Sequence, residues 1–99
     1  MNKFFDDLGK RWVSAAQRDG STIDAPALDS EVALELLELA RVAAHTQERR
    51  FAPLSCYLAG VAAERVRTAK PQTDSTAIAA LIRDVRQELE TSYPAPSER

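Results

Sequence analysis

The sequence has few of the residues on which several classes of protein depend. Its 99 residues include one cysteine, Cys56, which excludes an internal disulfide and a cysteine-based zinc site. The longest run without a charged residue, 51–63, is shorter than the ~20 apolar residues that cross a bilayer. The first twenty residues carry charges throughout, unlike a signal peptide. We therefore expect no membrane span and a cytoplasmic location, where a lone cysteine stays reduced.

The sequence also has few glycines and no large excess of charge of one sign. The three glycines include no Asn-Gly or Asp-Gly turn between alternating strands, which favours helices over a sheet. The net charge of -2 lacks the basic excess of a dedicated nucleic-acid-binding protein. Hydrophobic residues make up 44% of the chain, enough for folding. The length suits one small domain, predicted over residues 1–94, with a frayed tail at 95–99.

Helical periodicity runs through most of the chain. Four segments repeat apolar residues at three- and four-residue spacing: residues 2–19, 29–45, 53–67 and 74–93. Asn2 is a candidate N-cap of the first helix, and Asp29 or Ser30 of the second. Pro53 suits the first turn of a helix, and Gly20 is a plausible terminator. The predicted fold class is all-α, a compact bundle of four helices.

The second predicted helix is apolar around most of its circumference. Its polar residues fall on one narrow stripe: Glu31, Glu35, Glu38, Arg41 and His45. A helix with so little polar surface is expected to be mostly buried as the central helix of the fold. We expect the stripe to be solvated rather than to bind metal, because the paired Glu-x-x-His motifs of di-iron bundles are absent.

The third predicted helix carries a row of small residues that would let another helix approach closely. Gly60 in this row costs about 1 kcal/mol relative to alanine, which predicts a packing reason for it. Cys56 lies in the same row and is predicted to be a buried structural thiol rather than a nucleophile. Trp12 in the first helix is expected in the core or on a partner-facing patch. Phe4 falls off the main apolar stripe, which indicates an exposed apolar edge.

Charge is segregated along the chain, with a net -5 over residues 24–48 and a net +4 over residues 49–70. The two segments meet at the turn between the second and third helices. Because the start of a helix is the positive end of its dipole, Arg49, Arg50, Ser55 and His45 form a candidate site for a phosphate or carboxylate.

A structural alternative stays open at this turn. The two arginines can be solvated or pair with nearby acids such as Glu48 and Glu38. His45 on its own suits the negative end of a helix dipole, and no partner that would orient it as a catalytic base is evident.

The sequence contains no catalytic constellation, so we expect no enzymatic activity, no cofactor and no metal. One interpretation is an interaction module that docks on a partner protein or on itself. A second is a binder of a small anionic ligand at the candidate site. The third, nucleic-acid binding, is least favoured, because the chain is acidic and an acidic helix precedes the basic segment. Its candidate residues are Arg49, Arg50, Arg65, Arg67 and Lys70.

Three stretches resemble a small uncharacterised helical domain family of actinobacteria: residues 36–45, 48–54 and 57–62, together with Trp12. Thr46 and Gln47 depart from the family pattern, which has glycine and a small residue there. The family occurs alone or appended to proteins resembling the molybdenum-cofactor guanylyltransferase. The resemblance implies an accessory or protein-binding role near molybdopterin nucleotide chemistry, and no catalytic residues. Its matched positions include His45, Arg49 and Arg50 of the candidate anion site.

Overall fold

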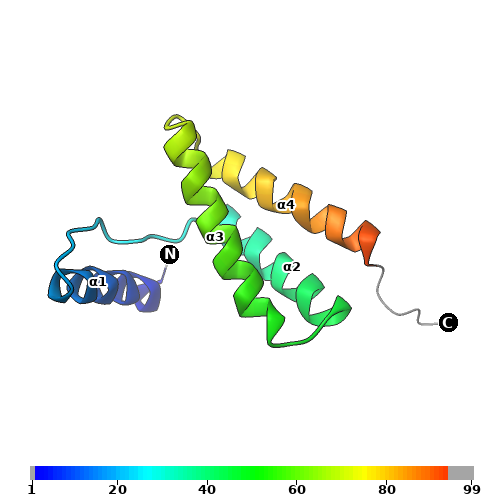
Figure 1. The fold of residues 1–99 in the computed structure, drawn as a ribbon, viewed down its shortest axis with the longest axis horizontal. Helices are drawn as coiled ribbons and strands as arrows, with labels where there is room; N and C mark the ends of the chain where they lie inside the picture. Colours follow the sequence, from blue (N-terminus) through cyan, green and yellow to red (C-terminus); the bar gives the residue numbers. More distant parts are fainter. Residues whose placement is uncertain (1, 94–99) are drawn as a thin grey trace. The chain divides into compact units, whose positions relative to one another are not determined.

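The computed structural model describes residues 2–93, which form four α-helices (Figure 1). The helices are α1 (Lys3–Arg18), α2 (Ser30–Thr46), α3 (Phe51–Ala69) and α4 (Ser75–Ser92). Every boundary lies within two residues of its predicted position, and the all-α class with four helices is confirmed. The predicted frayed tail at 95–99 lies outside the described residues.

Local signals in the sequence explain where the helices begin and end. Asn2 Oδ1 accepts a hydrogen bond from Phe5 N at 3.3 Å, so the predicted N-cap of α1 is confirmed. Asp74 caps α4 in the same way, because its Oδ1 accepts a hydrogen bond from Ala77 N at 2.9 Å. The cap at Asp29 or Ser30 stays a prediction. Gly20 follows α1 with a φ of 87°, the left-handed conformation that ends many helices. Helix α3 begins two residues earlier than expected, and Pro53 still lies in its first turn, where no N–H donor is needed.

Contacts within the chain define two compact units, residues 1–30 and residues 31–99. In the first unit, the segment after α1 packs back on that helix. Gly9 is buried there, and a Cβ atom at this position would lie 2.5 Å from the carbonyl oxygen of Pro26. The second unit contains α2, α3 and α4. The single domain over residues 1–94 stays a prediction.

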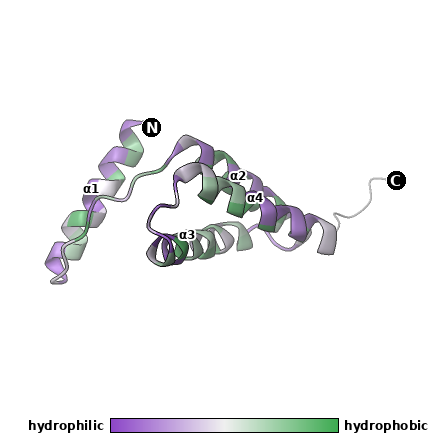
Figure 2. Cartoon of the chain, turned by 90° about the horizontal axis from the view of Figure 1, so that it is seen from above, coloured by the Kyte–Doolittle hydropathy of each residue, from purple (hydrophilic) through white to green (hydrophobic). Residues whose placement is uncertain are grey.

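In the second unit, α2 and α4 run side by side in the same direction, and α3 crosses them in the opposite direction (Figures 1 and 2). The core draws on all three helices: Leu39 from α2, Ala63 from α3, and Ile78 and Ile82 from α4. The small residues of α3 allow a close approach to α2, since the Cys56 thiol donates to the Leu36 carbonyl at 3.6 Å. The predicted close packing of this row is therefore seen at Cys56 and at the buried Ala63.

The expectation that the second helix is mostly buried is wrong. Leu39, Val42 and Ala43 are the buried residues of α2, whereas Leu34 and Leu37 are 65% and 66% exposed. Glu35 and Arg41 of the polar stripe pair with α4, and Leu36 of the same helix contacts α3. Leu34 lies three residues after Glu31 and four before Glu38, and Leu37 lies four before Arg41, so both leucines sit beside the stripe on the outward side of the helix. The expected solvated stripe holds for Glu31, Glu38, Arg41 and His45, which are exposed, whereas Glu35 is half-buried against α4.

The packing reason predicted for Gly60 is also wrong. No atom of residues 2–93 outside the neighbouring turns of α3 lies within 4 Å of a Cβ atom built on Gly60. This glycine is exposed on α3, so its small size is not required by a neighbouring helix.

Candidate functional site

The turn between α2 and α3 holds three of the four predicted anion-site residues. His45 lies in the last turn of α2, and Arg49 lies in the turn itself, with both side chains exposed. Arg50 is the N-cap residue of α3, and its Nε donates to Glu48 Oε1 at 2.8 Å. The sequence left open that the two arginines pair with nearby acids instead of binding an anion. Arg50 does form such a pair. Ser55 is half-buried in α3 and lines an apolar groove. The anion site stays a prediction.

Cys56 lies at the α2–α3 contact as a half-buried thiol. Burial raises the pKa of the Cys56 thiol above its usual value, because the thiolate would lose hydration there. A raised pKa keeps the sulfur protonated and poorly nucleophilic at neutral pH. The half-buried position of Cys56 and the hydrogen bond from its Sγ to the Leu36 carbonyl thus support a structural role in packing α3 against α2.

A ladder of polar contacts joins α2 to α4. At its start, Thr76 Oγ1 donates to Glu31 Oε1 at 2.8 Å. At its far end, Arg41 pairs with Glu90 at 3.4 Å and with Glu38 on its own helix at 2.9 Å. The order of these contacts along both helices shows that α2 and α4 are parallel neighbours.

Arg86 occupies the middle of this ladder, and its side chain is 15% exposed. Its guanidinium pairs with Glu35 at 3.2 Å and with Glu90 at 3.1 Å, while Arg83 adds a longer contact to Glu35 at 3.7 Å. Partial burial lowers the pKa of Arg86, but hydrogen bonds and charges from the two carboxylates outweigh it, so the pKa lies above its usual value. The ladder therefore holds two helices together and does not leave a free acid or base for catalysis at Arg86.

Sequence reasoning missed an apolar groove between α3 and α4. It has a volume of about 310 Å³, and Ser55 is the one polar residue among its lining side chains. The others are Leu39, Leu58, Ala59, Ala62, Leu81, Ile82, Val85 and Leu89. The apolar row of α3 is visible in the sequence, but the groove needs α4 beside it. Figure 2 shows hydrophobic colouring along much of α3.

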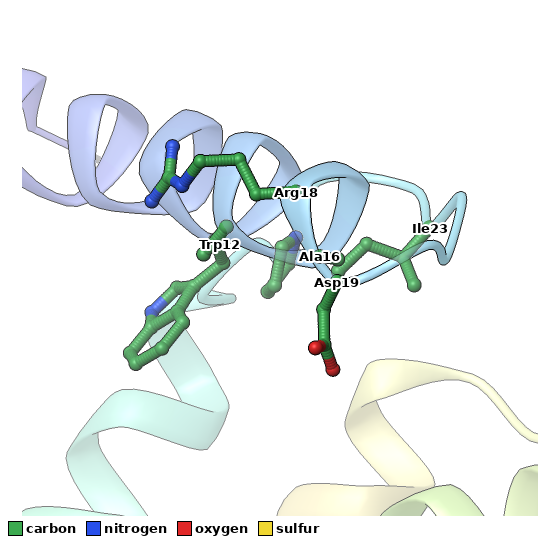
Figure 3. A pocket seen from close by; sticks show the side chains of 7 residues that line it. Trp12, Ala16, Arg18, Asp19 and Ile23 are labelled. Atoms are coloured by element: carbon green, nitrogen blue, oxygen red, sulfur yellow. The ribbon is translucent and has the colours of Figure 1, made fainter.

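The first unit has an open hollow beside α1 (Figure 3). It is lined by Trp12, Ala15, Ala16, Arg18, Asp19, Ile23 and Pro26. Trp12 and Asp19 point to the same side of α1, while the guanidinium of Arg18 turns away from Asp19 (Figure 3). Trp12 and Phe4 are both exposed, and the exposed apolar edge expected at Phe4 is confirmed. The residues that line this hollow do not form a recognisable catalytic arrangement.

Residues 2–93 contain neither a cluster of metal ligands nor a helix able to cross a membrane. No group of three or more His, Cys, Asp or Glu side chains in this part of the chain is arranged to hold a metal ion. No helix of the described residues combines the length and hydrophobicity that crossing a membrane requires.

Comparison with known proteins places the chain in a family. The model of a domain of unknown function, DUF6457, matches residues 6–96, which is most of the chain. The chain belongs to the DUF6457 family. The predicted membership in an uncharacterised domain family is therefore confirmed. Neither a curated protein nor a solved structure matches the chain of this DUF6457 domain.

Proposed function

We propose that this DUF6457 domain is a non-enzymatic helical interaction module that binds a protein surface through an apolar row on α3. Leu54, Tyr57 and Leu58 form this row and are 61%, 72% and 67% exposed. Burying one such side chain at an interface gains about 1.5–3 kcal/mol. Contiguous exposed apolar side chains mark interaction sites on proteins. The exposure of this row is the observation on which the proposal rests.

The balance of buried and exposed side chains in α2–α4 supports the same function. The large hydrophobic residues buried in these helices are Leu39, Val42, Ile78 and Ile82. More are exposed on the same helices: Leu34, Leu37, Phe51, Leu54, Tyr57, Leu58 and Val85. A partner that covered some of these side chains would remove their apolar surface from water, which favours association.

The resemblance noted in the sequence supports a more specific partner. Similar domains of actinobacteria occur alone or appended to proteins resembling the molybdenum-cofactor guanylyltransferase. We therefore place the partner near molybdopterin nucleotide chemistry and the protein in an actinobacterium. The single cysteine supports a reducing compartment, the cytoplasm.

Affinity capture from cells of the source organism, with chemical cross-linking, tests the proposed function. The full chain should capture a defined protein, and the double variant Leu54→Glu/Leu58→Glu should lose it, because two charges would have to be desolvated at the interface. The matched control, Gln72→Glu/Gln87→Glu, adds the same charge at exposed polar positions and should retain the partner. Circular dichroism checks that each variant folds. A chain that captures no protein and does not self-associate would overturn the proposal.

A second function, binding of a small anionic ligand, is supported by Arg49. This arginine is exposed before the positive end of α3 and has no ion pair with another of residues 2–93. A thermal-shift assay with nucleotides and pterin phosphates should show stabilisation that Arg49→Ala/Arg50→Ala removes. Lys70→Ala, at an exposed position of the α3–α4 connection, is the control and should keep the response. An identical ligand response in the double variant and the wild type would exclude the site.

A further inference from the structure

The hollow beside α1 exists because the chain turns back on this helix. Just after the helix ends, Ser21 N donates to Ala16 O at 2.8 Å, which brings the following segment alongside α1. Pro26 of that segment packs on the buried Gly9. Ile23 and Pro26 thus line the hollow on one side, and α1 lines it on the other.

On the α1 side, Trp12 and Asp19 mark the two ends of the hollow. They are seven residues apart, which is about two turns and about 10 Å along the axis, so they lie on the same face. The lining residues between them, Ala15 and Ala16, are small and leave the space open. Figure 3 shows Ala16 between the indole and the carboxylate. The hollow therefore has an aromatic ring at one end, an apolar floor and an acid at the other end.

The carboxylate of Asp19 is an unpaired negative charge. It forms no ion pair or hydrogen bond with another of residues 2–93. The neighbouring Arg18 also lines the hollow, but its guanidinium turns away from Asp19 (Figure 3). Asp19 is the C-cap residue of α1, where the helix dipole is negative. A positive group at this end of the hollow would meet the carboxylate and the negative end of the dipole together.

The two ends of the hollow favour different parts of one ligand. The exposed indole of Trp12 and the small floor favour an apolar body, because its contact with them removes apolar surface from water. Asp19 favours a cation that can donate a charge-assisted hydrogen bond. An anion would be repelled there, and a neutral apolar molecule would desolvate the carboxylate without replacing its hydrogen bonds. This combination fits an ammonium group on an apolar carrier.

We propose that the hollow binds a small organic ammonium ion, with its apolar body against Trp12 and its charged group at Asp19. Binding sites of this kind combine a mostly apolar lining with a few polar groups that fix the orientation of the ligand. The site belongs to the first unit and shares no residue with the apolar row of α3. The inference therefore goes beyond the proposed interaction function and does not depend on it.

Titration of the full chain with hexylammonium, followed by the fluorescence of Trp12, tests the site. Trp12 is the single tryptophan of the chain, so a saturable change in its emission reports binding beside it. Hexanol has the same apolar body without the charge, and hexanoate carries the opposite charge. Both should bind at least about tenfold more weakly, because neither can form a charge-assisted hydrogen bond from an ammonium group to the carboxylate.

Three variants separate the charges around the hollow. Asp19→Asn should weaken the binding of hexylammonium by about tenfold or more, because it removes the negative charge and keeps the shape of the side chain. Asp6→Asn, the matched control, makes the same change in the first turn of α1 and should leave the affinity unchanged. Arg18→Gln should strengthen binding, since it removes a positive charge that borders the hollow. Circular dichroism checks that each variant folds.

Each contrary result overturns a stated part of the proposal. Hexanol that binds as tightly as hexylammonium would make the hollow an apolar surface without selectivity for charge. An unchanged affinity in Asp19→Asn would remove the carboxylate as the cation-binding group. Tight binding of hexanoate that Arg18→Gln abolishes would make this an anion site. A short peptide whose lysine binds more tightly than hexylammonium would overturn the small amine as the ligand. Whether the α3 row captures a protein affects none of these outcomes.

Discussion

Gly9 and Gly60 are both glycines inside helices, but their surroundings are opposite. A Cβ atom at Gly9 meets the Pro26 carbonyl, whereas one at Gly60 meets open space. Alanine is favoured over glycine by about 1 kcal/mol in a helix, so Gly60→Ala should raise the free energy of unfolding by about that amount. Gly9→Ala should lower it by about 1–3 kcal/mol, because the backbone must shift to relieve the contact.

Denaturant titration followed by two probes measures both changes. Trp12 is the single tryptophan of the chain and lies on α1, so its fluorescence follows the first unit. Far-ultraviolet circular dichroism follows the helices as a whole. A Gly9→Ala variant as stable as the wild type by fluorescence would contradict the close approach to Pro26. A destabilised Gly60→Ala variant would show that something does cover that position.

At the level of the helices, the sequence predicted well which segments are helical and where each helix begins and ends. It did not predict which faces of the helices are buried. Boundaries depend on neighbours in the chain, such as the caps at Asn2 and Asp74, and so are encoded locally. The polar stripe of α2 has its partners some fifty residues away on α4. Periodicity shows that such a stripe exists, but cannot show whether water or Arg86 faces it.

The contact between α2 and α4 should depend more on Arg86 than on Arg83. Arg86→Ala removes the pairs with Glu35 and Glu90 and leaves Glu35 largely buried without them, so it should cost about 1–3 kcal/mol of stability. Arg83→Ala is the matched control, since its side chain is 44% exposed and its contact with Glu35 is long. It should cost less than about 1 kcal/mol.

Thermal and denaturant unfolding of the two variants measure this difference. Added salt screens exposed pairs most, so any effect of Arg83→Ala should fade in salt while that of Arg86→Ala persists. Equal losses of stability in the two variants would mean that the ladder is an ordinary surface network.

Across the whole molecule, the candidate sites differ in whether they can be predicted from the sequence alone. The turn with His45, Arg49 and Arg50 could be proposed from sequence because its residues are neighbours in the chain. The groove could not, because Leu58 and Val85 come from helices whose pairing no local pattern specifies. The exposed row of α3 was visible as an apolar face. Its exposure follows only from the fact that α2 and α4 cover the other sides.

The parallel pairing of α2 with α4 has a consequence for how the second unit forms. Its polar contacts join residues 45, 49 and 51 positions apart, and two of the four main core residues, Ile78 and Ile82, come from α4. Contacts of such long separation slow folding, because the loop between them must close first. During synthesis, α2 and α3 emerge before the helix that completes their core. The nascent hairpin therefore exposes its apolar residues until residue 82 has left the ribosome, which makes this interval the time at which the chain is most open to aggregation or to a chaperone.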